Sequence, residues 1–71
     1  MVNVDKLRGK IVEKRMSVEK VAEAIGLDVS TLYRKLKYSD KLTIGEASKI
    51  SKVLELTAAE VNDIFFAHFV A

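Results

Sequence analysis

The chain has 71 residues, no cysteine and a net charge of +2. The absence of cysteine excludes disulfides, thiol catalysis and zinc-finger sites, and it favours a reducing cytoplasm. No apolar run approaches the roughly 20 residues of a membrane span and the N-terminal sequence is not a signal peptide, so we expect one soluble cytoplasmic domain over residues 1–71, with no contact to a membrane.

The positive charge is concentrated in the N-terminal half of the chain. Residues 1–37 contain nine Lys or Arg and five Asp or Glu, a balance of +4, whereas residues 38–71 contain three and five, a balance of −2. A chain polarised in this way can turn a positive face toward phosphates and its other face toward a partner. The alternative is that basic side chains only hydrate helix surfaces, which we expect for Lys6, Lys20, Lys49 and Lys52.

Residues 4–15 are predicted to form the first helix, because apolar residues recur there with helical spacing. The side chains expected to face the core are Val4, Leu7, Ile11 and Val12. Gly9 weakens a helix by roughly 1 kcal/mol relative to alanine, so we expect another helix backbone to pass close to it. We expect Met16 to fill a gap in the core just beyond this helix.

Residues 17–37 are predicted to hold two short helices joined by a tight turn. Ser17 supplies the N-cap oxygen of the first of these helices. Its apolar stripe consists of Val21, Ala22 and Ile25. Gly26 follows the stripe directly, where a left-handed residue without a Cβ ends a helix at the lowest cost, and Leu27 fills the corner. The small Ala22 permits a close crossing of the two helices.

The second helix of this motif is predicted to have a core side and a polar side. Asp28 is its N-cap, with a carboxylate expected to accept amide hydrogens, so the helix begins at Val29. At about 100° per residue, the core side consists of Val29, Leu32, Tyr33 and Leu36. The polar side consists of Ser30, Arg34, Lys37 and Tyr38. The motif is therefore a helix-turn-helix whose polar side is the one that would read DNA.

The motif resembles that of the phage repressor and Cro family, also called the xenobiotic-response-element family of bacterial regulators, over nearly the whole chain. The matching residues are Val21, Ala22, Ile25, Gly26, Leu27, Leu32 and the string Ser30-Thr31-Leu32-Tyr33-Arg34-Lys35-Leu36. Many members have glycine where this chain has Arg15, which predicts a less sharp end to the first helix. Many members have Gln where this chain has Val18, which removes one usual phosphate contact. Many also have an apolar residue where this chain has Lys35, and we expect Leu36 to provide the packing of that residue. The string is also similar to the DNA-binding tail of Fis-like proteins, but more than thirty residues follow it here, which favours the repressor type.

Two further helices are predicted after a short polar connection at residues 38–41. Thr43-Ile44-Gly45-Glu46 and Thr57-Ala58-Ala59-Glu60 both have capping-box spacing, so the helices begin at Ile44 and just after Thr57. Their expected core residues are Ala47, Ile50, Val53 and Leu54 in the former, and Val61, Ile64 and Phe65 in the latter. Together with the resemblance, these signals predict an all-α, compact five-helix bundle of the phage-repressor DNA-binding domain type.

The resemblance implies a sequence-specific transcriptional regulator of double-stranded DNA, of the phage or prophage repressor type, with its third helix in the major groove. Arg34 is expected to read guanine, since a guanidinium can bond O6 and N7 together. The other residues expected at bases are Val29, Ser30 and Tyr33. The alternative for Val29 is that it only packs against the core, and Tyr33 is half turned toward the core by its helical angle. Phosphate contacts are expected from Ser17, Thr31, Lys35, Lys37, Tyr38, Ser39 and Lys41.

The C-terminal segment, residues 58–71, is predicted to contribute a homodimer contact. Adjacent Phe65 and Phe66 are not expected to face one core from one helix, so Phe66, with Phe69 and Val70, is assigned to the dimer. The alternative is that the tail folds back over the core or frays. A two-fold dimer would place two recognition helices about 34 Å apart on a near-palindromic operator.

We expect no enzyme, cofactor or metal site. The single histidine, His68, has no second imidazole or thiol as a partner, and the acidic residues suit helix starts or hydrated faces. The competing hypothesis is a protein-binding adaptor that keeps the helix-turn-helix fold without specific DNA binding. An adaptor would tend to show an apolar or acidic face, whereas Arg34, Lys35 and Lys37 cluster with hydroxyl groups.

Overall fold

The computed structural model describes residues 2–38 and 42–66, and every regular element within these ranges is a helix. The elements are α1 (Val4–Glu13), α2 (Val18–Ile25), α3 (Val29–Lys37), α4 (Ile44–Val53) and α5 (Ala58–Val61), which continues into a π-helical turn, η2 (Asn62–Phe66). The predicted all-α fold with five helices is confirmed. No helix in these ranges is both long enough and apolar enough to span a membrane.

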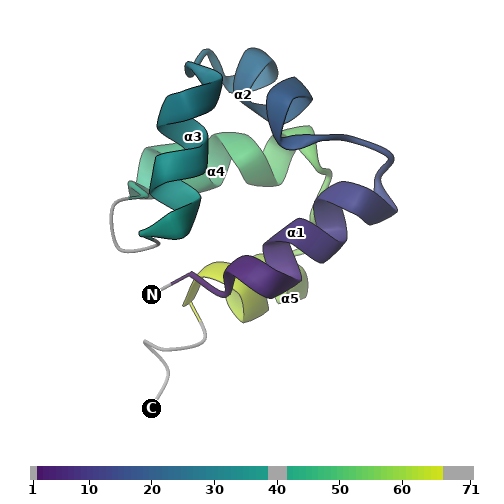
Figure 1. Cartoon of the computed structure of the whole chain (residues 1–71). Coiled ribbons are helices and arrows are strands. Elements are labelled where there is room, and N and C mark those ends of the chain that lie inside the picture. Colours follow the sequence, from purple (N-terminus) through teal and green to yellow (C-terminus); the bar gives the residue numbers. More distant parts are fainter. Residues whose placement is uncertain (1, 39–41, 67–71) are drawn as a thin grey trace.

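Helix α4 lies at the centre of the bundle, with α2 and α3 on one side of it and α1 and α5 on the other (Figure 1). Helix α2 packs against both α3 and α4, and α1 packs against η2. The largest side chains that are fully buried are Leu7, Val21, Leu32, Ile50 and Leu54. The first four of these side chains, Leu7, Val21, Leu32 and Ile50, come from α1, α2, α3 and α4 in that order. A single core therefore holds the helix-turn-helix in place.

Short-range capping signals set where the helices begin. The Ser17 hydroxyl oxygen accepts the amide hydrogen of Lys20 at 3.1 Å, as predicted. Both predicted capping boxes are complete, Thr43 with Glu46 and Thr57 with Glu60. Helix α1 has a cap that was not predicted, because the Asn3 side chain accepts from the amide of Lys6 at 3.1 Å.

Three helices end in the same hydrogen-bonding pattern, the Schellman motif. Its left-handed residue is Arg15 (φ 57°) after α1, Gly26 (φ 79°) after α2 and Glu55 (φ 52°) after α4. The amide that follows each donates to a carbonyl five residues back, namely Met16 to Ile11, Leu27 to Ala22 and Leu56 to Ser51, at 2.9, 2.9 and 3.0 Å. The prediction of a less sharp end near Arg15 is wrong, because these bonds stop α1 at Glu13, two residues before the predicted end.

Two predictions for α1 are wrong. The side chain of Val12 is 73 % exposed, because the buried stripe of Leu7 and Ile11 is narrow and Val12 lies beyond its edge. A Cβ built on Gly9 would meet no atom within 4 Å, so no other helix backbone passes close to this residue. Met16, by contrast, packs against the core as predicted.

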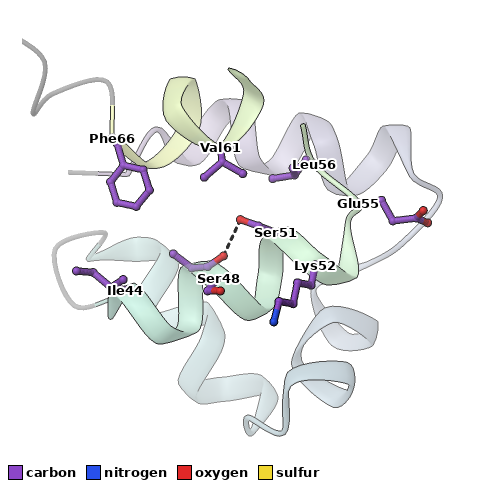
Figure 2. A pocket seen from close by; sticks show the side chains of 9 residues that line it. Ile44, Ser48, Ser51, Lys52, Glu55, Leu56, Val61 and Phe66 are labelled. Carbon is purple, nitrogen blue, oxygen red and sulfur yellow. Dashed lines mark hydrogen bonds between the residues drawn. The ribbon is translucent and has the colours of Figure 1, made fainter. Parts of the chain in front are cut away.

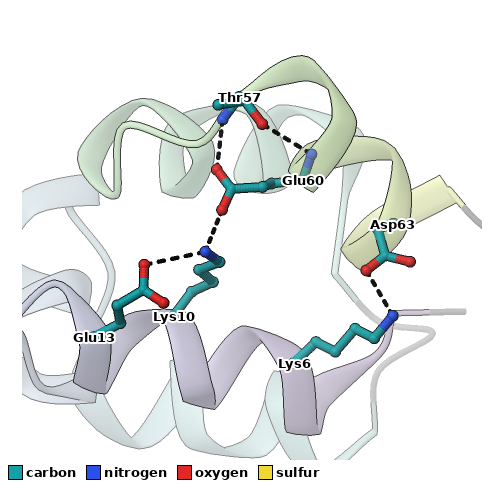
Figure 3. Close-up of polar contacts among 6 residues, drawn as sticks. All are labelled: Lys6, Lys10, Glu13, Thr57, Glu60 and Asp63. Carbon is teal, nitrogen blue, oxygen red and sulfur yellow. Dashed lines mark hydrogen bonds and ion pairs between the residues drawn. The ribbon is translucent and has the colours of Figure 1, made fainter.

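Ion pairs tie α1 to the C-terminal helix (Figure 3). The Lys6 ammonium lies 2.6 Å from a carboxylate oxygen of Asp63, and Lys10 pairs with both Glu60 and Glu13. The hydrogen bond from Lys10, together with one from the Thr57 amide, lowers the pKa of Glu60 to about 2. These contacts fasten α1 to α5 and η2, on the side of α4 away from α2 and α3 (Figure 1).

The prediction that Phe65 and Phe66 cannot both face the core is wrong. Phe65 is 3 % exposed and Phe66 is partly buried against the core, with their ring centroids 6.4 Å apart. In an α-helix Val61 and Phe66 would point about 140° apart, but the wider π turn brings positions five apart onto one side. Val61 and Phe66 therefore line the same hollow, between α4 on one side and α5 with η2 on the other (Figure 2).

Candidate nucleic-acid interface

Helices α2 and α3 and the turn between them form the predicted helix-turn-helix. Ala22 is fully buried, and α2 and α3 are in direct contact. Gly26 adopts the left-handed conformation that ends α2, and Leu27 packs against the core at the corner. The motif is thus anchored by buried side chains, which leaves the opposite side of α3 open to solvent.

Asp28 occupies the N-cap position of α3, but the predicted role of its carboxylate is wrong. The carboxylate makes no hydrogen bond to an amide of the first turn. It accepts the hydroxyl hydrogen of Ser30 at 2.5 Å instead. A serine hydroxyl two residues on is a strong local competitor for the same oxygen atoms. The first amides of α3 consequently have no side-chain cap.

The outer face of α3 is polar and positively charged. Ser30, Arg34 and Lys37 are exposed, whereas Leu32 and Leu36 on the opposite side are buried. Tyr33, predicted from its angle to be half in the core, is 41 % exposed and lies at the edge of this outer face. The ammonium of Lys37 lies 5.7 Å from the centroid of the Tyr38 ring, a cation–π distance.

Val29 and Thr31 are less accessible than the rest of the face. Val29 is partly buried and packs against the core, as in the alternative considered from the sequence. Thr31 is also partly buried. Ser17, at the start of α2, is partly buried, with its oxygen engaged by the amide of Lys20. Contacts of these three residues with DNA stay predictions.

Lys35 points toward α4 and pairs with Glu46. Its ammonium lies 2.8 Å from one carboxylate oxygen and 3.0 Å from the other, and the two side chains are 21 % and 18 % exposed. Glu46 also accepts the Thr43 amide in the capping box. Partial burial raises the pKa of Glu46, but the hydrogen bonds from Lys35 and Thr43 outweigh it and hold the pKa below its usual value. Lys35 therefore joins α3 to the start of α4.

Tyr33 is hydrogen-bonded to Glu19, and this bond links the outer surfaces of α3 and α2. The phenol oxygen lies 3.2 Å from a carboxylate oxygen of Glu19. The hydrogen bond raises the pKa of Tyr33, with a smaller contribution from burial, while the positive charge of Arg8 opposes the increase. Glu19 places a negative charge at the edge of the surface that carries Arg8, Arg34 and Lys37.

Arg8 extends the basic surface from α3 onto α1. It lines one open hollow together with Tyr33, Arg34 and Lys37, and a second one with Ser17, Glu19 and Tyr33. From the sequence, no role was assigned to Arg8 or to Glu19. No local pattern marks either residue, because their positions depend on how α1 and α2 cross α3.

Some of the remaining predicted contact residues lie outside the described part of the chain. Ser39 and Lys41, predicted at phosphates, and Phe69 and Val70, predicted at a dimer contact, lie outside the described residues. Phe66 lines a hollow of about 440 Å³ between α4 and the C-terminal helix (α5 with η2). Ile44 lies on the other side of this hollow and is 76 % exposed (Figure 2).

Within residues 2–38 and 42–66, no group of His, Cys, Asp and Glu side chains is arranged to hold a metal ion.

Comparison with known proteins gives one family. A family model described as the Cro/C1-type HTH DNA-binding domain matches residues 6–66, which is most of the chain. No curated protein and no solved structure matches the sequence significantly. The matched range contains the whole helix-turn-helix and extends into η2, so the match covers the motif and the helices that support it.

Proposed function

The chain belongs to the Cro/C1-type helix-turn-helix family of DNA-binding domains, and from this premise we propose that it is a sequence-specific transcriptional regulator that reads the major groove with α3. The repressor type, known from phages and prophages, is the form of regulator we propose. The observation that carries the proposal is the outer face of α3, where Ser30, Arg34 and Lys37 are all exposed while Leu32 and Leu36 are buried. This face offers hydrogen-bond donors and positive charge where a DNA-reading helix needs them.

The roles of individual residues follow from their chemistry and exposure. Arg34 is proposed to bond guanine O6 and N7, with Ser30 and Tyr33 at neighbouring bases and Val29 touching a thymine methyl group. Lys37 and Arg8 are proposed at phosphates, flanking the read bases. Further phosphate contacts are proposed for Ser17, Thr31, Tyr38, Ser39 and Lys41. We leave Lys35 out of this set because its ammonium group is paired with Glu46.

The experiment that tests the function is selection of bound sequences from a random pool of double-stranded DNA at low salt. Wild-type protein is expected to enrich one motif. Arg34→Ala should relax the preference at one base position, whereas Lys37→Ala should weaken binding to all sequences and reduce the slope of log affinity against log salt by about 1. Failure to enrich any sequence would refute the proposal and favour the protein-binding adaptor.

We also propose that the regulator acts as a homodimer on a near-palindromic operator. One recognition helix reads few bases, and single modules bury only roughly 600–1,000 Å² on DNA, so a doubled half-site gives the discrimination that a genome demands. The proposed contact comprises Phe66, Phe69 and Val70, with an operator whose half-sites are about 34 Å apart. Each aromatic ring buried across the axis would contribute roughly 1.5–3 kcal/mol before the cost of association.

Sedimentation of wild type and of a Phe66→Ser, Phe69→Ser variant tests the dimer. We expect wild type to dimerise and the variant to remain a folded monomer that binds a palindrome more weakly. Phe66 packs against the core, so Phe69→Ser alone, which keeps the Phe66 ring, is the matched second variant. A wild type that stays monomeric at high concentration and binds one half-site as tightly as a palindrome would refute the dimer.

A further inference from the structure

The hydrogen bond between Tyr33 and Glu19 has a defined polarity. At neutral pH a carboxylate accepts hydrogen bonds and donates none, so the phenol gives its only hydrogen to Glu19. The two oxygens are 3.2 Å apart, and both side chains are exposed on the outer surface of the motif. The phenol oxygen of Tyr33 therefore has only lone pairs left to offer to a further partner.

An acceptor-only group discriminates between bases in the major groove. Adenine and cytosine present exocyclic amino groups there, which donate hydrogen bonds, whereas guanine O6 and N7 and thymine O4 accept them. A phenol whose hydrogen is already used can bond the amino groups, and it repels the acceptors. Glu19 is itself an acceptor and carries a negative charge, so it strengthens both effects.

We propose that Glu19 is a specificity-determining residue, which fixes Tyr33 as a hydrogen-bond acceptor so that the pair selects adenine or cytosine at the base it faces. The inference rests on the proposed function, since it requires α3 to lie in the major groove. The raised pKa of the Tyr33 phenol agrees with a hydrogen held on that oxygen by Glu19. Arg8, which lines the same hollow as Glu19 and Tyr33, supplies the positive charge that keeps this edge of the surface attractive to phosphates.

Glu19 also has a simpler role, because an acidic residue in the first turn of α2 interacts favourably with the helix dipole. That role affects stability and leaves base preference unchanged. Glu23 provides a matched control: it is exposed, lies one turn further along α2, and loses the same charge in a Glu→Gln substitution. A readout of base preference therefore separates the two roles of Glu19.

The test is selection from a random DNA pool with wild type, Tyr33→Phe, Glu19→Gln and Glu23→Gln, each checked for folding by circular dichroism. In Glu19→Gln the side chain keeps its size, but its amide can donate to the phenol as well as accept from it. The phenol is then no longer restricted to accepting, and its hydrogen can reach guanine or thymine. Wild type is expected to favour adenine or cytosine at one position by about fivefold over guanine or thymine, the lower end of discrimination by base contacts. Tyr33→Phe and Glu19→Gln should lose most of this preference, and Glu23→Gln should keep it.

The outcomes separate this inference from the proposed function. If wild type enriches a motif and Glu19→Gln leaves every position of that motif unchanged, the inference is overturned while the function stands. The same conclusion follows if Tyr33→Phe changes no position, or if Glu23→Gln changes the same position as Glu19→Gln. If wild type enriches no motif, the proposed function fails and the inference fails with it.

Discussion

Arg15→Gly and Glu55→Gly are both expected to stabilise the domain, although each removes a side chain from a helix end. The two residues have φ values of 57° and 52°, in the region where an L-residue pays roughly 1–2 kcal/mol relative to a right-handed conformation. Glycine avoids this strain but loses about 0.5–1 kcal/mol more backbone entropy on folding. The difference predicts a net gain of about 0.5–1 kcal/mol at each site.

Gly26→Ala is the converse substitution and should destabilise the domain. Gly26 has a φ of 79°, and a Cβ built there meets no atom within 4 Å. The cost is therefore backbone strain alone, reduced by the entropy that alanine loses in the unfolded chain. We expect a loss of about 1 kcal/mol.

Thermal and urea unfolding followed by circular dichroism would measure these changes. A gain of about 0.5–1 kcal/mol corresponds to an increase in Tm of roughly 2–8 °C in a domain of this size. Lys14→Gly is the matched control, since Lys14 loses the same charge from the same helix end but has a φ of −84°. It should lose stability, by about 0.5–1 kcal/mol. If Arg15→Gly destabilises the domain as much as Lys14→Gly does, the reasoning from left-handed strain is wrong.

Three further substitutions test contacts inside the bundle. Lys10, together with the Thr57 amide, lowers the pKa of Glu60 from its ordinary 4.5 to about 2. The ion pair therefore adds stability above the ordinary pKa, and this stability is lost as the pH falls toward 2. Lys10→Met removes the largest of these causes and should show a smaller fall in Tm over this range, and an equal fall would contradict the assignment. Lys35→Met should cost roughly 1 kcal/mol and raise the pKa of Glu46, as measured by denaturation and NMR titration, because the pair is about four-fifths buried. Leu32→Ala, at a side chain 1 % exposed, should cost roughly 2–5 kcal/mol and abolish most of the helical circular dichroism; a cooperative transition near the wild-type Tm would refute it.

The starts of α2, α4 and α5 were predictable because an N-cap depends on atoms three residues apart. Ser17, Thr43 and Thr57 each accept the expected amide hydrogen. The end of α2 was predictable at Gly26, where the residue type reveals the left-handed conformation, and the end of α3 at Lys37, where the polar connection begins. At Arg15 the same conformation is imposed by hydrogen bonds to carbonyls further back in α1, and the side chain itself opposes it.

The candidate interface was predictable where it depends on the period of one helix. The exposure of Ser30, Arg34 and Lys37 follows from about 100° per residue. The partners of Lys35 and Tyr33 are 11 and 14 residues away in sequence, on other helices. Such pairs depend on the angles and distances at which helices cross, which no local pattern of residues encodes.

The π turn from Asn62 to Phe66 bears on how this domain can change in length. A π turn holds one residue more than an α turn. The insertion of a single residue into an α-helix produces the same arrangement. If one residue between Val61 and Phe66 were deleted, an ordinary α-helix would place them four positions apart, within about 40° of each other around its axis. Phe66 would then still face the hollow beside α4. Single-residue deletions should be tolerated here better than in α1 or α3, and natural relatives are expected to differ in length by one residue at this turn.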